Sequence, residues 1–131
     1  MLNIGSYLRI VDNSGAKLAK CLKNIKKNIK QTVSIGDLIL VVLKNFKNRK
    51  KISKRVIYIG LVVGIKYWLI RKDGTFVKFF NNRVLIFNKQ FKFLGSRVYG
   101  LILKEVKVKL LKHKKYRSYF KKIVMFNSFI I

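Results

Sequence analysis

Thirty-one lysines and arginines stand against only four acidic residues in this chain, so its formal net charge is +27. Half of the residues are nevertheless hydrophobic, and 131 residues are enough for one domain with one core. Disordered basic tails lack such apolar content, so we expect a folded chain. Because so many like charges repel each other in a compact state, we also expect a permanent polyanion as partner. Nucleic acid is the first candidate and an anionic membrane surface the second.

Metal ligands and catalytic bases are scarce in the sequence. Cys21 is the only cysteine and His113 the only histidine, so neither an intrachain disulfide nor a Cys/His zinc site can form. We expect Cys21 to pack as a small apolar residue. His113 lies in a lysine-rich run, where like-charge repulsion weakens it as a base, and we expect it to contact RNA. The sequence therefore indicates a protein that is not an enzyme and uses no cofactor or metal.

The four carboxylates have simple structural interpretations. Asp12, Asp37 and Asp73 each lie beside turn residues, where an aspartate side chain caps the backbone. Glu105 follows Lys104 in a segment with helical spacing, which favours a local ion pair. The pattern offers no pair of base and nucleophile on which a hydrolase could be built.

The composition also indicates where the chain is encoded. Proline is absent, alanine occurs only at Ala16 and Ala19, and lysine outnumbers arginine 24 to 7. These preferences follow A/T-rich codons and predict an organelle-encoded, mitochondrial protein, with a plastid or an A+T-rich bacterium as alternatives.

Residues 1–13 lack the apolar core of a secretory signal. The uncharged run at 56–65 is too short to span a bilayer, which needs about 20 apolar residues, so we expect no membrane insertion.

Short apolar runs alternate with turn signals along the first 100 residues. Strands are expected at 2–10, 17–25, 38–43, 56–65, 76–80 and 84–88, between Asx–Gly and Asn-rich turns. Gly60 and Gly64, four residues apart within one strand, indicate bends or bulges. This spacing is typical of a small β-barrel. The residues expected to shape its turns are Asp12, Asn13, Gly15, Gly36, Asp37, Asp73, Gly74, Gly95 and Gly100.

After residue 100 the hydrophobic spacing becomes helical. Residues 101–119 predict one or two short amphipathic helices. Residues 123–131 are nearly all apolar and must pack on something. We therefore divide a single domain, 1–131, into a β-barrel part, 1–100, and a part with short helices and an apolar tail, 101–131.

The most basic stretch is 44–55, which has seven cations in twelve residues and almost no apolar surface to bury. We expect an exposed loop whose side chains follow a nucleic-acid backbone. Its expected phosphate contacts are Lys44, Lys47, Arg49, Lys50, Lys51, Lys54 and Arg55.

Aromatic residues are interleaved with cations, as Trp68 is with Lys66, and Phe76 and Phe80 are with Lys78. One interpretation is base stacking beside phosphate contacts, and the other is a barrel core with the cations outside. The alternation favours the core for the phenylalanines and leaves Trp68 undecided.

Two alternative functions follow from these features. A free-standing OB-type single-strand-binding module would need aromatics lined up on one sheet face, and a cationic membrane-surface protein would use the apolar tail.

Five elements occur in the order and spacing of a known family. They are 11–16, 36–37 with the apolar strand after it, 71–75 with Phe79 and Asn82 after it, 95–100 with Lys104 and Glu105 after it, and 120–123. Together they resemble the universal L-fourteen family of large-subunit ribosomal proteins over essentially the whole chain. Lys72 and Leu101 stand where that family usually has proline.

The resemblance implies a mostly β fold, namely a five-stranded β-barrel with an extended β-ribbon and short C-terminal α-helices. It implies a structural constituent of the large ribosomal subunit that binds rRNA on the subunit-facing side and helps bridge to small-subunit rRNA. It also implies neighbours of the L-three and L-nineteen families and docking of a ribosome-silencing factor. Because A-form RNA hides its major groove from side chains, shape and phosphate readout should dominate. The matched elements add expected RNA contacts at Arg71, Lys72, Lys78, Arg97 and Lys104, and we include Lys17 and Lys66.

Overall fold

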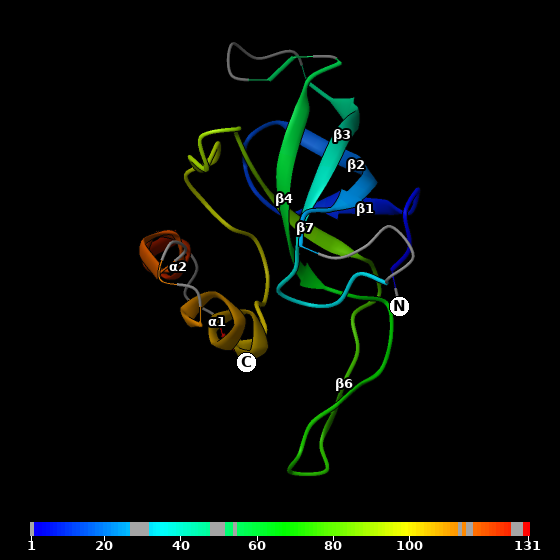
Figure 1. Cartoon of the computed structure of the whole chain (residues 1–131), viewed down its shortest axis with the longest axis vertical. Helices are drawn as coiled ribbons and strands as arrows, with labels where there is room; N and C mark the ends of the chain where they lie inside the picture. The colour runs from blue at the N-terminus through cyan, green and yellow to red at the C-terminus, as the bar shows by residue number, and fades with distance from the viewer. Residues whose placement is uncertain are drawn as a thin grey trace.

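A closed five-stranded barrel forms the centre of the molecule (Figure 1). The computed structural model describes residues 2–26, 32–47, 52–53, 55–112, 114, 117–126 and 130–131. The barrel strands, in their order around it, are β1 (Tyr7–Ile10), β2 (Ala16–Asn24), β3 (Leu38–Phe46), β4 (Ile57–Gly64) and β7 (Arg83–Phe87). Neighbouring strands run antiparallel except β1 and β7, whose parallel pairing closes the barrel. The expected barrel is confirmed.

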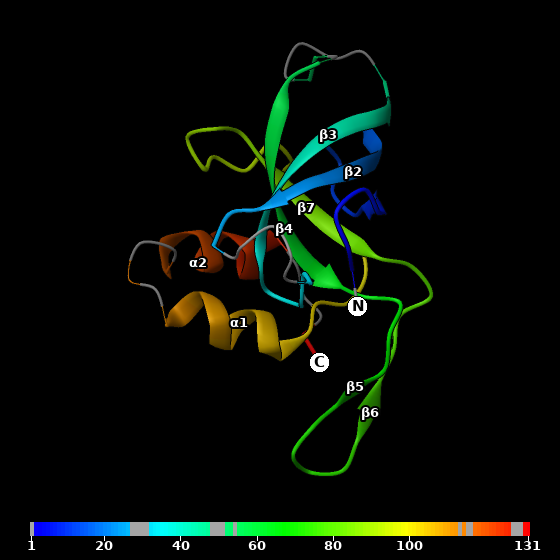
Figure 2. The same cartoon turned by 45° about the vertical axis from the view of Figure 1, so that its right-hand side comes forward.

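A two-stranded ribbon projects from the barrel (Figure 2). It consists of β5 (Leu69–Ile70), a turn, and β6 (Phe76–Val77), and we call residues 69–77 the ribbon. In the turn the Arg71 N–H donates to the Thr75 carbonyl at 2.9 Å and the Gly74 N–H donates to the Arg71 carbonyl at 3.1 Å. Gly74 has a φ of 86°, a conformation that costs glycine little. The Asp–Gly hairpin expected from the sequence is therefore formed.

Two helices follow the barrel: α1 (Lys104–Leu111) and α2 (Arg117–Phe126). Helix α1 buries Val106 and Leu110, four residues apart on one face. Helix α2 buries Ile123 and thus extends into the stretch expected as an apolar tail. The main chain of Ile131 is also bonded to this part of the fold, because its N–H donates to the Ile102 carbonyl at 2.9 Å, while its side chain stays exposed.

The core fills the barrel interior. Cys21 is fully buried in it, as expected, and burial raises the pKa of its thiol. Gly60 lies where β4 crosses the core, and a Cβ atom there would lie 2.7 Å from Cγ2 of Val84. The pairing of β4 with β7 shifts register between Val62 and Gly64. The expected irregularity is thus confirmed at Gly64, whereas Gly60 makes room for side chains.

The expected boundary of the basic loop was wrong. Strand β3 continues through residues 44–46, because Phe46 pairs with Ala16 of β2 and packs against the core. Ile52 is also buried, so the stretch does bury apolar surface. Of the cations in this stretch, Arg49, Lys50, Lys51 and Lys54 lie outside the described residues.

The expected core position of the phenylalanines in 76–80 was wrong for two of them. Phe76 is 61% exposed and Phe80 is 92% exposed, and Trp68 is 56% exposed. Phe76 lies in β6 and Trp68 directly before β5, in a two-stranded ribbon region that projects from the barrel and is not part of its sheet. The strand expected at 76–80 ends at Val77, so Phe80 follows in a loop, while Phe79 is half-buried against the core. The sequence alternation in this segment therefore does not continue a barrel strand.

Candidate nucleic-acid interface

Asp12 anchors the turn between β1 and β2 to β7. We call the parallel β1–β7 pairing that closes the barrel the barrel seam. The buried carboxylate of Asp12 accepts hydrogen bonds from the Ser14 N–H at 3.0 Å and from the Ser14 hydroxyl. It also accepts from the Ile86 N–H of β7 at 3.3 Å. Burial raises the pKa of Asp12, and the hydrogen bonds from Ser14 oppose that shift. The side chain therefore caps its own turn and joins it to a strand far along the chain.

Asp37 holds helix α1 against the turn before β3. Its carboxylate accepts from the N–H and the hydroxyl of Ser34 at 2.9 and 3.1 Å, and it lies 3.1 Å from Nζ of Lys109. Gly36 has a φ of 79° beneath Lys109, and a Cβ there would lie 2.8 Å from Cδ of that lysine. This turn thus serves as a docking point for the helix.

Asp73 and Glu105 shape the ribbon and its attachment. Asp73 accepts from the N–H and the hydroxyl of Thr75 at 3.0 and 2.7 Å, and these contacts lower its pKa. The expected local pair of Glu105 with Lys104 was wrong, because Glu105 instead pairs with Arg71, at 2.7 and 3.2 Å. The Arg71 guanidinium also donates to the Ile131 carbonyl at 3.0 Å. Arg71, expected to contact RNA, therefore ties the ribbon to α1 and the chain end.

The side-chain carboxylates of all four acidic residues thus bind other residues of this chain. Four acidic residues against 31 lysines and arginines leave most of the positive charge without an acidic partner. Exposed Lys and Arg side chains attract phosphates. The positions of the exposed cations therefore define the candidate interface.

One group of cations surrounds the turn at Asp12–Gly15, and we call Lys17, Lys47 and Arg97 the turn cluster. The Lys47 N–H donates to the Gly15 carbonyl at 2.9 Å, which brings the end of β3 to this turn. The Asn13 side-chain oxygen accepts from the N–H of Ser96 and of Arg97 at 2.7 and 3.1 Å. The three cationic side chains are all exposed. Three segments remote in sequence thus present positive charge together.

Further expected contacts lie near this cluster. Lys17 sits where the pairing of β2 with β3 shifts register between Ala16 and Leu18, and Lys44 lies on β3 opposite the next shift, between Leu18 and Ala19. Arg55, just before β4, has a φ of 67°. Gly95 approaches the same turn so closely that a Cβ would lie 2.8 Å from the Asn13 side-chain oxygen. Lys44 and Arg55 are exposed, so they extend the positive surface at this end of the barrel.

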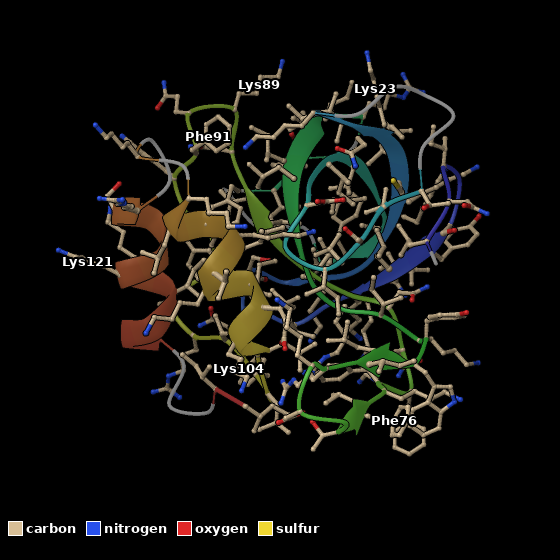
Figure 3. The ribbon with its side chains drawn as sticks, turned by 60° about the horizontal axis from the view of Figure 1, so that its bottom comes forward. Lys23, Phe76, Lys89, Phe91, Lys104 and Lys121 are labelled. Carbon is tan, nitrogen blue, oxygen red and sulfur yellow. The ribbon has the colours of Figure 1, made fainter. Side chains whose placement is uncertain are left out.

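A second group of cations lies around the ribbon, and we call Lys66, Lys72, Lys78 and Lys104 the ribbon cluster. All four are exposed. The Lys66 N–H donates to the Asn82 side chain at 2.9 Å, and Nζ of Lys78 lies 5.1 Å from the centre of the Trp68 ring. In Figure 3, Lys104 and Phe76 lie toward the ribbon side, away from Lys23 and Lys89. Apart from Arg71, the expected RNA contacts that the structure describes thus form two groups, one at the turn and one at the ribbon.

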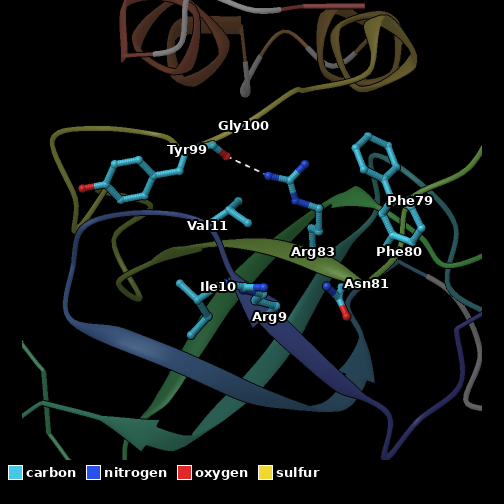
Figure 4. Close-up of a pocket in the computed structure, with 9 residues that line it drawn as sticks. All are labelled: Arg9, Ile10, Val11, Phe79, Phe80, Asn81, Arg83, Tyr99 and Gly100. Carbon is cyan, nitrogen blue, oxygen red and sulfur yellow. Dashed lines mark hydrogen bonds between the residues drawn. The ribbon is translucent and has the colours of Figure 1, made fainter.

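Two arginines that the sequence pattern did not single out meet at the barrel seam. Arg9 of β1 and Arg83 of β7 are register partners in the parallel pair. A cavity of about 450 Å³ opens beside them (Figure 4), and its lining includes Asn81, Phe80 and Tyr99 but no acidic residue. Only the cross-strand register could have revealed this pair. We call this cavity the seam pocket.

None of the helices among the described residues is both long and apolar enough to cross a bilayer. Comparison with known proteins identifies a family and a similar protein. The model of the family described as ribosomal protein L14p/L23e matches residues 1–125. The chain is also similar to the large ribosomal subunit protein uL14 of Carsonella ruddii (strain PV), with 36% identity over 107 residues, which cover 82% of this chain and 88% of that protein.

Proposed function

Because the chain belongs to the ribosomal protein L14p/L23e family, it is a structural, non-enzymatic constituent of the large ribosomal subunit, and we propose that it binds large-subunit rRNA through its exposed cations. The observation that carries this proposal is the engagement of every carboxylate within the fold. The remaining positive charge needs an external polyanion, and rRNA supplies one at fixed spacing. The mechanism is electrostatic and geometric, without catalysis.

The turn cluster is the first contact area that we propose. The backbone of two of its residues is fixed to the turn, because the Lys47 N–H donates to the Gly15 carbonyl and the Arg97 N–H donates to the Asn13 side-chain oxygen. Fixed backbone positions suit the phosphates of an A-form helix, which have a regular spacing. This area therefore suits shape and phosphate readout rather than base readout.

The ribbon cluster is the second contact area, and we propose that it faces the small subunit and its rRNA. Lys72 lies in the turn of a ribbon that projects from the barrel, so it can reach a partner that the barrel does not touch (Figure 2). The exposed Phe76 on the ribbon and the exposed Trp68 directly before it suit neighbouring proteins. Neighbours of the L-three and L-nineteen families and a docked ribosome-silencing factor stay predictions, as does the mitochondrial location.

Sedimentation of the native protein from a lysate tests the proposal directly. We expect co-migration with the large subunit at moderate salt and release only at high salt, because several phosphate contacts weaken together as salt rises. A peak in the light fractions at both salts would contradict rRNA binding and favour a free-standing single-strand-binding module. Binding of the purified protein to anionic vesicles at physiological salt would favour the membrane-surface alternative.

Removing the turn cluster should reduce the salt dependence of rRNA binding. For the triple variant Lys17→Ala, Lys47→Ala and Arg97→Ala, the slope of log affinity against log salt should fall by about 3, one for each phosphate contact. The matched control replaces Lys23, Lys89 and Lys107, three exposed lysines outside both clusters. Equal losses in the two triple variants, measured on a double-stranded rRNA fragment, would show that charge alone and not its placement drives binding.

A further inference from the structure

The seam pocket combines two like charges, and its lining holds no acidic residue to pair with them. Arg9 and Arg83 are direct partners across β1 and β7, so their side chains leave the barrel on the same face. Like charges in such positions destabilise a sheet. The four carboxylates of the chain are all engaged elsewhere. A compact anion bound between the two guanidinium groups would remove this repulsion.

Arg83 is held in a fixed place rather than left mobile. Its guanidinium donates to the Tyr99 carbonyl at 2.8 Å and to the Leu101 carbonyl at 3.2 Å. It also lies 5.2 Å from the centre of the Phe79 ring, a cation–π distance. Burial, and then the like charge of Arg9, lower the pKa of Arg83, yet arginine stays charged at neutral pH.

Two glycines make room for this arrangement. Gly100 has a φ of 80°, and a Cβ there would overlap the Arg83 guanidinium. At Gly64 a Cβ would lie 3.1 Å from the Phe79 ring and 3.2 Å from Cδ of Arg83. The backbone is therefore shaped around the Arg83 side chain, as expected of a binding group that is organised before its ligand arrives.

An exposed aromatic ring lies beside the two cations. Phe80 is 92% exposed although it lines the pocket, and Figure 4 shows it with Phe79 on one side of Arg83, with Tyr99 on the other. An apolar ring left in water next to cations suits a nucleic-acid base, which stacks on any aromatic face. A free phosphate or a protein carboxylate would satisfy the arginines but would leave this ring in water. The amide of Asn81 adds a donor and an acceptor at the pocket wall.

We propose that the seam pocket binds one unpaired nucleotide of RNA, with its phosphate between Arg9 and Arg83 and its base stacked on Phe80. The inference rests on the proposed rRNA binding and adds a site for a single unstacked base to the two clusters of phosphate contacts. Guanidinium groups match phosphate oxygens in charge and geometry. A single nucleotide is thus the smallest ligand that uses every feature of the pocket.

The test separates base stacking from charge. The full chain is titrated with an octauridylate and with an octamer of abasic ribose phosphates, which has the same backbone but no bases. The unmodified protein should prefer the octauridylate by on the order of 10-fold, and Phe80→Ala should abolish that preference. The matched control is Phe76→Ala, which removes another exposed phenylalanine outside the pocket and should keep it. If the two variants lose the preference equally, or if the unmodified protein shows none, the proposal is overturned.

Arg9→Ala tests the phosphate half of the site. It should weaken binding of both octamers and lower the salt slope by about 0.7, while the melting temperature of the RNA-free protein should rise because the repulsion at the seam is gone. A fall in that melting temperature would contradict the repulsion inferred between Arg9 and Arg83.

A competition experiment compares inorganic phosphate with uridine monophosphate. If inorganic phosphate competes as well as uridine monophosphate, the pocket is an anion site and the nucleotide assignment is overturned. Failure of this site alone would leave sedimentation with the large subunit intact, whereas failure of the proposed function would abolish it.

Discussion

Replacing Asp12 with alanine is expected to lower the free energy of unfolding by about 3 kcal/mol, because two backbone N–H groups lose their acceptor. The Ser14 N–H lies in the turn and the Ile86 N–H in β7, and the carboxylate between them is buried. A buried donor without a partner loses the full hydration of its N–H group. Chemical denaturation of the RNA-free protein measures the difference.

Asp73→Ala provides the matched control for this prediction. Asp73 accepts the same two hydrogen bonds, from the N–H and the hydroxyl of the residue two positions ahead, but it is exposed. Water can replace its contacts, so its loss should be much smaller. Equal effects of the two substitutions would show that the turn contacts matter and that burial and the link to β7 do not.

The pH dependence of stability gives a second readout for Asp12. Burial raises its pKa in the folded chain, so the folded state holds the proton more tightly than the unfolded state. Between pH 3.8, the ordinary carboxyl value, and the raised value, the contribution of Asp12 to stability therefore falls as the pH rises. Asp12→Asn has no such titration, so the stability of the unmodified protein relative to this variant should decline across that window. A relative stability that rises with pH would contradict the raised pKa.

Gly60→Val is expected to destabilise the barrel by about 3 kcal/mol, because the core has no room for a side chain there. The first carbon alone would lie 2.7 Å from Cγ2 of Val84 and 3.1 Å from Cγ1 of Val41. These atoms belong to neighbouring barrel strands, so the strands would have to separate. Thermal unfolding of the variant measures the loss.

Two further variants identify the cause of that loss. Gly74→Ala adds a Cβ where nothing lies within 4 Å, and its φ of 86° leaves a backbone strain of about 1 kcal/mol. In the double variant Gly60→Ala and Val84→Ala, the smaller residue at 84 frees the space, so the loss should be less than the sum of the single losses. Additive losses would indicate that Gly60 is needed for its backbone and not for the space beside it.

The turns could be predicted from the sequence because their chemistry is local. In the ribbon turn, Asp73, Gly74 and Thr75 supply the acceptor, the positive φ and the donors within three consecutive residues. The Asp12 turn likewise contains its own cap at Ser14. Such contacts form at short chain separation, where little entropy is lost on closing the loop, so neighbouring residues decide them.

The partners of charged groups could not be predicted in the same way. Glu105 has Lys104 beside it in the sequence, yet it binds Arg71 because the ribbon and α1 meet in the folded chain. Arg9 and Arg83 become neighbours only through the parallel pairing that closes the barrel. The choice between core and surface was also misjudged for Phe80, because β6 ends at Val77 and the alternation after it has no sheet to follow.

The excess of positive charge, the family and the positions of the turns can be read from the amino-acid sequence, since each depends on residue identity and on neighbours a few positions apart. The grouping of the cations, the exposure of the aromatic rings and the pairing of the two arginines depend on the folded barrel. They depend on it because barrel closure places remote residues side by side. The register between β1 and β7 is set by packing of the whole core, and a shift of one residue would turn every side chain of a strand to the other face.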